Sequence, residues 1–153
     1  MAEATAPSAG KPGRAPAPGG AAAAPSVNLE TTTTWVRRWL RAEGIAALAG
    51  GLWAWLALGA AWPLFLVLLL VPDVSMVGYL KSTHAGAISY NIAHNWATGG
   101  LVLGLGAALD VPALVFAGIL LIAHVGMDRL FGYGLKYPTS FQDTHLGRIG
   151  KLR

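Results

Sequence analysis

The chain has 153 residues, the length of one domain, but its composition differs from that of an ordinary soluble protein. Charged residues make up 12% of the chain, about half of the usual share of about 25%, whereas AVILMFWYC residues make up 54% and the mean hydropathy is +0.52. The net charge of +4 comes from few, clustered cations, which argues against a nucleic-acid-binding surface, and the absence of cysteine excludes disulfides and thiolate metal sites.

The N-terminal segment is built mostly from alanine, proline and glycine. Residues 1–26 read MAEATAPSAGKPGRAPAPGGAAAAPS and contain no aromatic residue. Such a segment buries too little apolar surface to offset the entropy lost on folding. We therefore expect residues 1–30 to form a disordered tail and residues 31–153 to form the folded domain.

A long apolar stretch, EGIAALAGGLWAWLALGAAWPLFLVLLLVP, occupies residues 43–72 and has no charge after Glu43. As one helix it would be about 43 Å long, more than the hydrocarbon core of about 30 Å. The segment from Gly59 to Pro63 offers a break, because proline is tolerated in the first turn of a helix. The sequence therefore predicts helices at about 40–59 and 63–79. Both are short for full spans, so tilted helices and a re-entrant hairpin both remain open.

Two further helices are predicted, at about 85–109 and 111–131. Ser82 and Thr83 are candidate caps of the first, and Pro112 suits the first turn of the second. Gly100 and Gly104 form a G-x-x-x-G motif, for which packing within the chain is favoured over a dimer face. The predicted fold is therefore all-α, an integral membrane four-helix bundle.

The lysines and arginines predict the orientation of these helices. The turn around 59–62 and the turn around Asp110 hold none, whereas the other flanks hold several. By the positive-inside rule both termini, the middle loop and the C-terminal tail 132–153 are expected on the cytoplasmic side. The flanking cations are Arg37, Arg38, Arg41, Lys81, Lys136, Arg148, Lys151 and Arg153.

Polar residues gather on one face of the helix predicted at 85–109. At 100° per residue they form a stripe about 100° wide, which in lipid must face protein or water. On the next predicted helix, His124 and Asp128 share a face. His94 and His124 are both expected at roughly 10–14 Å below the cytoplasmic face, so their side chains can meet. The stripe consists of His84, Asn91, His94, Asn95 and Thr98.

Three interpretations of this cluster stay open. In the first, His94, His124 and Asp128, joined by Asp73 or by Asp143 and His145 of a tail folded over the mouth, bind zinc, iron or manganese and activate water. In the second, the cluster and Tyr90 form a proton or small-ion relay. In the third, the polar groups form a hydrogen-bond network that only packs the helices together.

Three stretches resemble a known family. They are PDVSMVGYL (72–80), AISYNIAHNWA (87–97) and LIAHVGMDRLFGYGLKYPTSFQDTHLGRIGK (121–151), and the resemblance covers about 37–151. The order of motifs is similar to that of the small bacterial membrane-protein family catalogued as domain of unknown function 4260. This resemblance implies a compact four-helix membrane protein but no activity. The positions that match its motifs are Asp73, Tyr79, Tyr90, Asn91, His94, His124, Asp128, Arg129, Lys136, Asp143 and His145.

We therefore expect a multi-pass protein of the bacterial inner membrane with a polar site open to the cytoplasm. The leading hypothesis is a metal-dependent or acid/base site for a small or lipophilic substrate. His94, His124 and Asp128 would be ligands or acid/base groups, and Asn91 and Tyr90 would orient them. The alternative is a small-ion or proton-coupled transport subunit, which would act as a homo-oligomer because four helices leave little room for a pathway.

Overall fold

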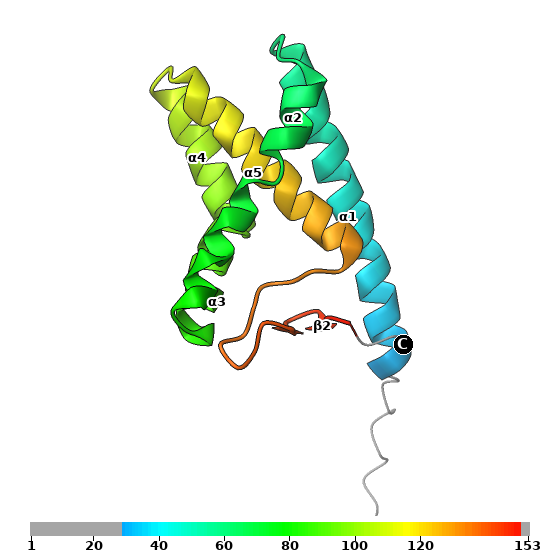
Figure 1. The fold of residues 1–153 in the computed structure, drawn as a ribbon. Helices are drawn as coiled ribbons and strands as arrows, with labels where there is room; N and C mark the ends of the chain where they lie inside the picture. The colour runs from blue at the N-terminus through cyan, green and yellow to red at the C-terminus, as the bar shows by residue number, and fades with distance from the viewer. Residues whose placement is uncertain (1–28, 151–153) are drawn as a thin grey trace, which may run out of the picture.

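The computed structural model of the protein describes residues 29–150, which are mainly helical (Figure 1). Within this range five α-helices and one 3-10 helix precede a short β-hairpin. This confirms the all-α class, but two of the four predicted helices are each divided. The elements are α1 (Leu29–Ala57), α2 (Trp62–Leu68), η1 (Val71–Leu80), α3 (Thr83–Ala93), α4 (Trp96–Ala108), α5 (Pro112–Phe131), β1 (Asp143–Thr144) and β2 (Gly147–Arg148).

The first helix starts much earlier than predicted. Residues 1–28 of the predicted tail lie outside the described part of the chain, whereas Leu29 and Glu30 already belong to α1, so the expected helix start at 40 is wrong. The predicted break that follows α1 is confirmed. Gly59 has a φ of +81°, a value that favours glycine, and Pro63 lies in the first turn of α2.

The second predicted helix, at 63–79, is not one α-helix. It ends as α2 at Leu68 and continues as the 3-10 helix η1, which starts beside Pro72. Proline has no N–H for the bond to the carbonyl of residue 68, and its ring collides with that carbonyl in an α-helix. Because a 3-10 helix has fewer residues per turn than an α-helix, the change to η1 alters the side of the helix on which Asp73 lies.

The third predicted helix, at 85–109, is divided into α3 and α4 at His94 and Asn95. The Asn95 side chain serves both helix ends: its Oδ1 accepts from the Thr98 N–H at 2.9 Å, and its Nδ2 donates to the carbonyl oxygens of Asn91 at 2.6 Å and Ile92 at 3.0 Å. These bonds cap the start of α4 and satisfy carbonyls at the end of α3. The predicted continuous polar stripe is therefore interrupted at its centre.

The fourth predicted helix, at 111–131, agrees with α5 (Pro112–Phe131) to within one residue. Pro112 occupies its first turn. Gly132 follows with a φ of +87°, and its N–H donates to the Arg129 carbonyl at 3.1 Å. This left-handed cap ends the helix and directs the chain away from its axis.

Helix α5 lies between α1 and α4 and crosses both (Figure 1). Glycines allow these close approaches. A Cβ on Gly44 of α1 would lie 2.5 Å from the Gly126 oxygen, and one on Gly118 of α5 would lie 2.4 Å from the Leu103 nitrogen of α4. Neither position has space for a methyl group, so the crossings depend on glycine.

Gly100 and Gly104 do not take part in this packing. Both are exposed, and a Cβ added to either would meet nothing within 4 Å. The expectation that this motif packs within the chain is therefore wrong: Gly99 and Gly106 are the buried glycines of α4. Gly100 and Gly104 instead lie on the exposed face of α4, and we call this surface without side chains the open strip.

The largest apolar core lies between α1, α2 and α5. The Trp55 ring contacts the Phe65 ring at 5.7 Å and the Phe116 ring at 4.8 Å between centroids, and its Nε1–H donates to the Ala61 carbonyl. The indole thus fixes the turn between α1 and α2. The buried members of this core are Trp55, Phe65, Leu69, Ile119, Leu120 and Ala123.

Much apolar surface stays outside this core. Among residues 29–150, the segments Trp62–Leu80 and Pro112–Phe131 are long and apolar enough to cross a membrane, judged by length and composition. Only 11% of the Trp62–Leu80 window is buried. Its exposed large apolar side chains include Leu66, Val67, Leu70, Val74, Val77 and Leu80.

After α5 the chain crosses from the α1 side toward α3 and returns as a β-hairpin (Figure 1). In the hairpin Asp143 pairs with Arg148 and Thr144 with Gly147. We call residues 132–150 the C-terminal segment. Asn91 of α3 holds it at Lys136: the Asn91 Nδ2 donates to the Lys136 carbonyl at 2.9 Å, and the Lys136 N–H donates to the Asn91 Oδ1 at 2.7 Å.

Candidate functional site

Three elements, α3, α5 and η1, each bring one polar side chain to a common point. His94 is the residue that ends α3, His124 lies in the buried part of α5, and Asp73 lies in the first turn of η1. Both imidazoles are fully buried, and the Asp73 side chain is 36% exposed. The division of two predicted helices therefore places His94 and Asp73 at the ends of elements that converge.

The three side chains point two imidazole nitrogens and one carboxylate oxygen at one another. The Nε2 atoms of His94 and His124 are 2.9 Å apart. The Asp73 Oδ1 lies 3.3 Å from the first and 3.5 Å from the second. The two histidines therefore share one site, as predicted from their depth on the two helices.

The protonation of each ring follows from its other nitrogen. The His94 Nδ1 lies 2.8 Å from the Tyr90 carbonyl oxygen, and the His124 Nδ1 lies 2.6 Å from the Leu69 carbonyl oxygen. Since a carbonyl oxygen only accepts, each Nδ1 carries the proton and donates it. In the neutral rings both Nε2 atoms are then acceptors. Three acceptor atoms thus converge on one volume.

This geometry matches the spacing of ligands around one metal ion. Two ligand atoms at about 2.0–2.1 Å from a zinc ion lie about 2.9–3.4 Å apart in octahedral to tetrahedral arrangements. The three observed separations, 2.9, 3.3 and 3.5 Å, fall in or next to this range. Asp73, His94 and His124 could therefore hold a metal.

Asp128 lies next to these three groups, but farther from the two imidazoles than Asp73. Its two carboxylate oxygens are each 4.0 Å from an Nε2 atom, Oδ2 from that of His94 and Oδ1 from that of His124. The Tyr90 hydroxyl donates to Oδ2 at 2.6 Å. The predicted ligand Asp128 is thus adjacent to the cluster, while Asp73 supplies the nearest carboxylate oxygen.

Tyr90 holds two members of the site at once. Its ring stacks on the His94 ring with centroids 3.6 Å apart and planes 14° apart, its carbonyl accepts from His94, and its hydroxyl fixes Asp128. These are contacts that the orienting role expected for Tyr90 would require, and that role stays a prediction. Asn91, expected to orient the same groups, instead binds the backbone of Lys136.

Asp143 and His145 stay away from the cluster. The Asp143 Oδ1 accepts from Arg148 at 2.7 Å, and its Oδ2 accepts from the Thr139 hydroxyl. The His145 Nδ1 accepts from the Leu135 N–H at 2.8 Å. The C-terminal segment does fold back toward the site, but these two side chains stabilise its own turns, so their expected place among the ligands is wrong.

Two members of the predicted polar stripe are also outside the cluster. His84 is exposed in the first turn of α3, and Asn95 caps the helix break. The break after His94 rotates α4 away from the direction in which α3 points. Angles calculated along one continuous helix therefore fail for Asn95 and Thr98.

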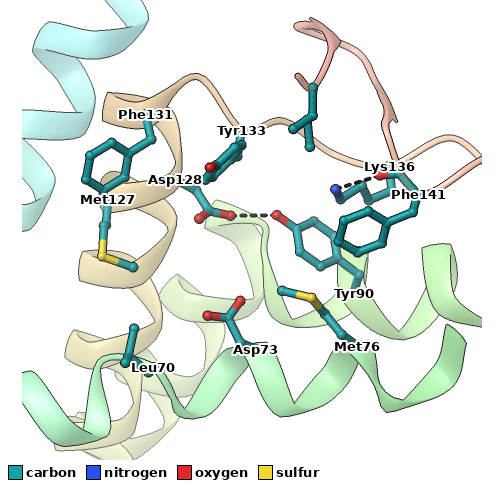
Figure 2. Close-up of a pocket in the computed structure, with 11 residues that line it drawn as sticks. Leu70, Asp73, Met76, Tyr90, Met127, Asp128, Phe131, Tyr133, Lys136 and Phe141 are labelled. Carbon is teal, nitrogen blue, oxygen red and sulfur yellow. Dashed lines mark hydrogen bonds between the residues drawn. The ribbon is translucent and has the colours of Figure 1, made fainter. Parts of the chain in front are cut away.

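A cavity of about 480 Å³ adjoins the cluster. Figure 2 shows Asp73 and Asp128 facing it, with the Tyr90 hydroxyl between them and Lys136. Because these two carboxylates also lie beside the imidazoles, a molecule in the cavity would lie next to the polar cluster. The lining residues are Leu70, Asp73, Met76, Tyr90, Met127, Asp128, Phe131, Tyr133, Lys136, Phe141 and Ile149.

Lys136 is a site residue that the charge pattern did not reveal. It was expected as a cytoplasmic cation and as a position that matches the family's motifs, but not as a site residue; it is 5% exposed and lines the cavity. Its Nζ donates to the Phe141 carbonyl at 2.8 Å. Burial lowers the pKa of its ammonium, and the carboxylates of Asp128 and Asp73 oppose that shift. Its place in the G-Y-G-L-K-Y-P motif was the available signal.

The comparison with known protein families matches residues 37–149 to the family described as Domain of unknown function (DUF4260). The chain belongs to this family. The match covers every residue of the cluster and cavity described above, so this DUF4260 protein carries its site within the family region. No curated protein and no solved structure matches the chain.

Proposed function

We propose that this DUF4260 protein is a membrane protein with a buried metal centre that acts on a small or lipophilic substrate. The observation that carries the proposal is the convergence of three acceptor atoms from His94, His124 and Asp73. Buried acceptors without a donor are costly, and a cation among them removes the cost. Two imidazoles and a carboxylate suit zinc, iron or manganese.

Asp128 and Tyr90 support a catalytic role for this centre. If a divalent metal were bound by these three residues, it would supply an activated water, because such a metal lowers the pKa of a water bound to it. Asp128 lies 4.0 Å from both Nε2 atoms and faces the cavity, so its carboxylate is in position to accept a proton from such a water or to complete the ligand set. Tyr90 holds it there.

The apolar exterior and the cation pattern support a multi-pass location in the bacterial inner membrane. Exposed apolar side chains along Trp62–Leu80 would be costly in water and favourable in lipid. The turn at 58–61 and the turn at 109–111 hold no lysine or arginine. The segment before the apolar part of α1, the turn between η1 and α3, and the C-terminal segment hold the lysines and arginines that flank the helices. With both termini cytoplasmic, the cavity opens near that face.

Association of copies through α4 is part of the same proposal. Among residues 29–150, no atom lies within 4 Å of a Cβ added at Gly100 or Gly104 in the open strip. Small residues four apart let two membrane helices approach closely. A homo-oligomer formed there would leave the cavity on α5 and η1 free for substrate.

The deciding experiment is metal analysis of the purified full-length protein. We expect one zinc, iron or manganese ion per chain in the wild type and less than a tenth of that in His94→Ala and His124→Ala. His84→Ala is the matched control, because His84 is exposed on α3 and outside the cluster. A wild type without metal, with both cluster variants merely less stable, would identify the cluster as a packing network.

A proton relay is the second candidate, since a shared proton between two Nε2 atoms 2.9 Å apart would also satisfy the acceptors. It predicts a metal-free protein and proton flux across proteoliposomes that Asp128→Asn abolishes. Flux that survives Asp128→Asn, or stoichiometric metal in the wild type, counts against the relay.

A further inference from the structure

The cavity has an apolar end and a cationic end. Figure 2 shows Leu70, Met127 and Phe131 on one side and Lys136 with Phe141 on the other. The carboxylates of Asp73 and Asp128 lie between the two ends. Its volume of about 480 Å³ is within the range of about 300–1,000 Å³ found for small-molecule sites.

Lys136 has donor capacity that residues 29–150 do not use. An ammonium carries three N–H donors, and the Lys136 Nζ gives one to the Phe141 carbonyl. The Nζ also lies 4.0 Å from the centroid of the Phe141 ring and 5.1 Å from that of Tyr90. Within residues 29–150 no carboxylate oxygen lies within 4.0 Å of it. A cation held by ring faces and one carbonyl remains available to an anion.

The apolar end of the cavity opens to the outer surface. Leu70 is 57% exposed and Phe131 is 62% exposed, although both line the cavity. Leu70 continues into the exposed apolar side of η1, where Val74 and Val77 lie. A molecule with an apolar chain can therefore leave that chain at this end while its polar end lies deeper in the cavity.

We propose that the cavity binds an amphiphile with one apolar chain and an anionic oxygen headgroup, either a carboxylate or a phosphate. The headgroup accepts hydrogen bonds from Lys136, and the chain extends past Met127 toward Leu70 and Phe131. The inference rests on the proposed function in one respect, because the ligand then lies beside the metal centre as its substrate. Binding itself depends on Lys136 and the apolar walls.

The test uses the full-length protein in phosphatidylcholine nanodiscs. The probe is dodecanoate with a photoactivated diazirine in its chain, compared with the matching dodecyl phosphate and dodecanol. We expect saturable labelling of α5 around Met127 and Phe131, with half-saturation for one of the anions at least tenfold below that for the alcohol. One charge-assisted hydrogen bond accounts for a factor of this size. The better anion identifies the headgroup as carboxylate or phosphate.

Variants of Lys136 locate the headgroup. Lys136→Met should raise the half-saturation concentration of the anion about tenfold and leave that of the alcohol unchanged, and Lys136→Arg should restore most of the anion binding. Lys81→Met, which changes an exposed lysine outside the cavity, is the matched control. If Lys136→Met does not fold, the comparison of anion with alcohol on the wild type still decides.

Equal half-saturation for the alcohol and both anions, or labelling spread over outward residues such as Val67 and Val74, overturns the proposal. Metal analysis of the same preparation separates the two inferences. Saturable labelling in a metal-free protein leaves the amphiphile site standing and removes the metal centre. Stoichiometric metal without saturable labelling does the reverse.

Discussion

The imidazoles of His94 and His124 meet edge to face, with ring centroids 4.7 Å apart and planes 76° apart, although they come from different helices. Each ring donates a hydrogen bond from its Nδ1–H to a backbone carbonyl, that of Tyr90 for His94 and that of Leu69 for His124. The backbone of two elements therefore aims both Nε2 atoms at a common point. Changes at the two Nε2 atoms and changes in the packing around them are therefore expected to have different consequences.

Removing metal should lower the thermal stability of the protein. A ligand present at about 1,000 times its Kd contributes about 4 kcal/mol to the folded state. We expect a chelator to lower the unfolding temperature of the wild type, followed by tryptophan fluorescence, and excess zinc or manganese to restore it. His124→Ala should start at the lower temperature and no longer respond to chelator, whereas His84→Ala should respond like the wild type. An unchanged wild-type unfolding temperature would speak against a structural contribution of metal.

Asn91→Ala should release the C-terminal segment from α3. The substitution leaves the Lys136 N–H and carbonyl without their partners, which costs about 1–3 kcal/mol. We expect faster hydrogen exchange over residues 133–148, with little change in α5. Gln142→Ala is the control, because Gln142 is exposed in the same segment. Equal exchange in the two variants would show that the Asn91 bonds do not hold the segment.

Glycine-to-alanine changes should separate the helix crossings from the outer face of α4. Gly118→Ala has no space for its methyl group against Leu103, so we expect a loss of about 1–3 kcal/mol in unfolding measurements. Gly100→Ala meets nothing within 4 Å and should be neutral, or more stable by up to about 1 kcal/mol through helix propensity. The association of copies proposed above predicts a smaller oligomer in Gly100→Ala without a loss of stability of the single chain, and an unchanged oligomer would contradict it.

Acid should loosen the turn between Leu135 and His145. Burial lowers the pKa of His145, the positive charge of Arg129 lowers it further, and a hydrogen bond with the Leu135 backbone partly opposes both. The folded state thus favours the neutral ring, whose Nδ1 accepts from the Leu135 N–H. Its stabilising contribution is complete above the unfolded pKa of about 6.5 and is lost as the pH falls below that value.

Hydrogen exchange of the Leu135 amide measures this effect. After correction for intrinsic rates, we expect its protection to fall as the pH is lowered below about 6.5 in the wild type. His145→Asn should flatten that dependence. The same slope in both proteins would assign the loosening to another group.

Several local features follow from the sequence because a single residue type dictates them. Proline at 63 and 112 begins helices, and glycine at 59 and 132 adopts the left-handed conformation that ends them. The convergence of His94 and His124 was also predictable, since both lie at a similar depth on neighbouring helices of known pitch. These inferences need only local geometry.

The closest carboxylate could not be predicted in the same way. The sequence by itself determined that the chain is helical, that its apolar segments lie where they do, and that His94 and His124 can meet. Only the tertiary structure decided that Asp73 joins them, that Asp143 and His145 do not, and that Lys136 is buried. The physical reason is that Pro72 turns one helix into a 3-10 helix and Asn95 divides another. Small changes in direction at such breaks displace every later side chain, and contacts between distant segments then select which polar groups share a site.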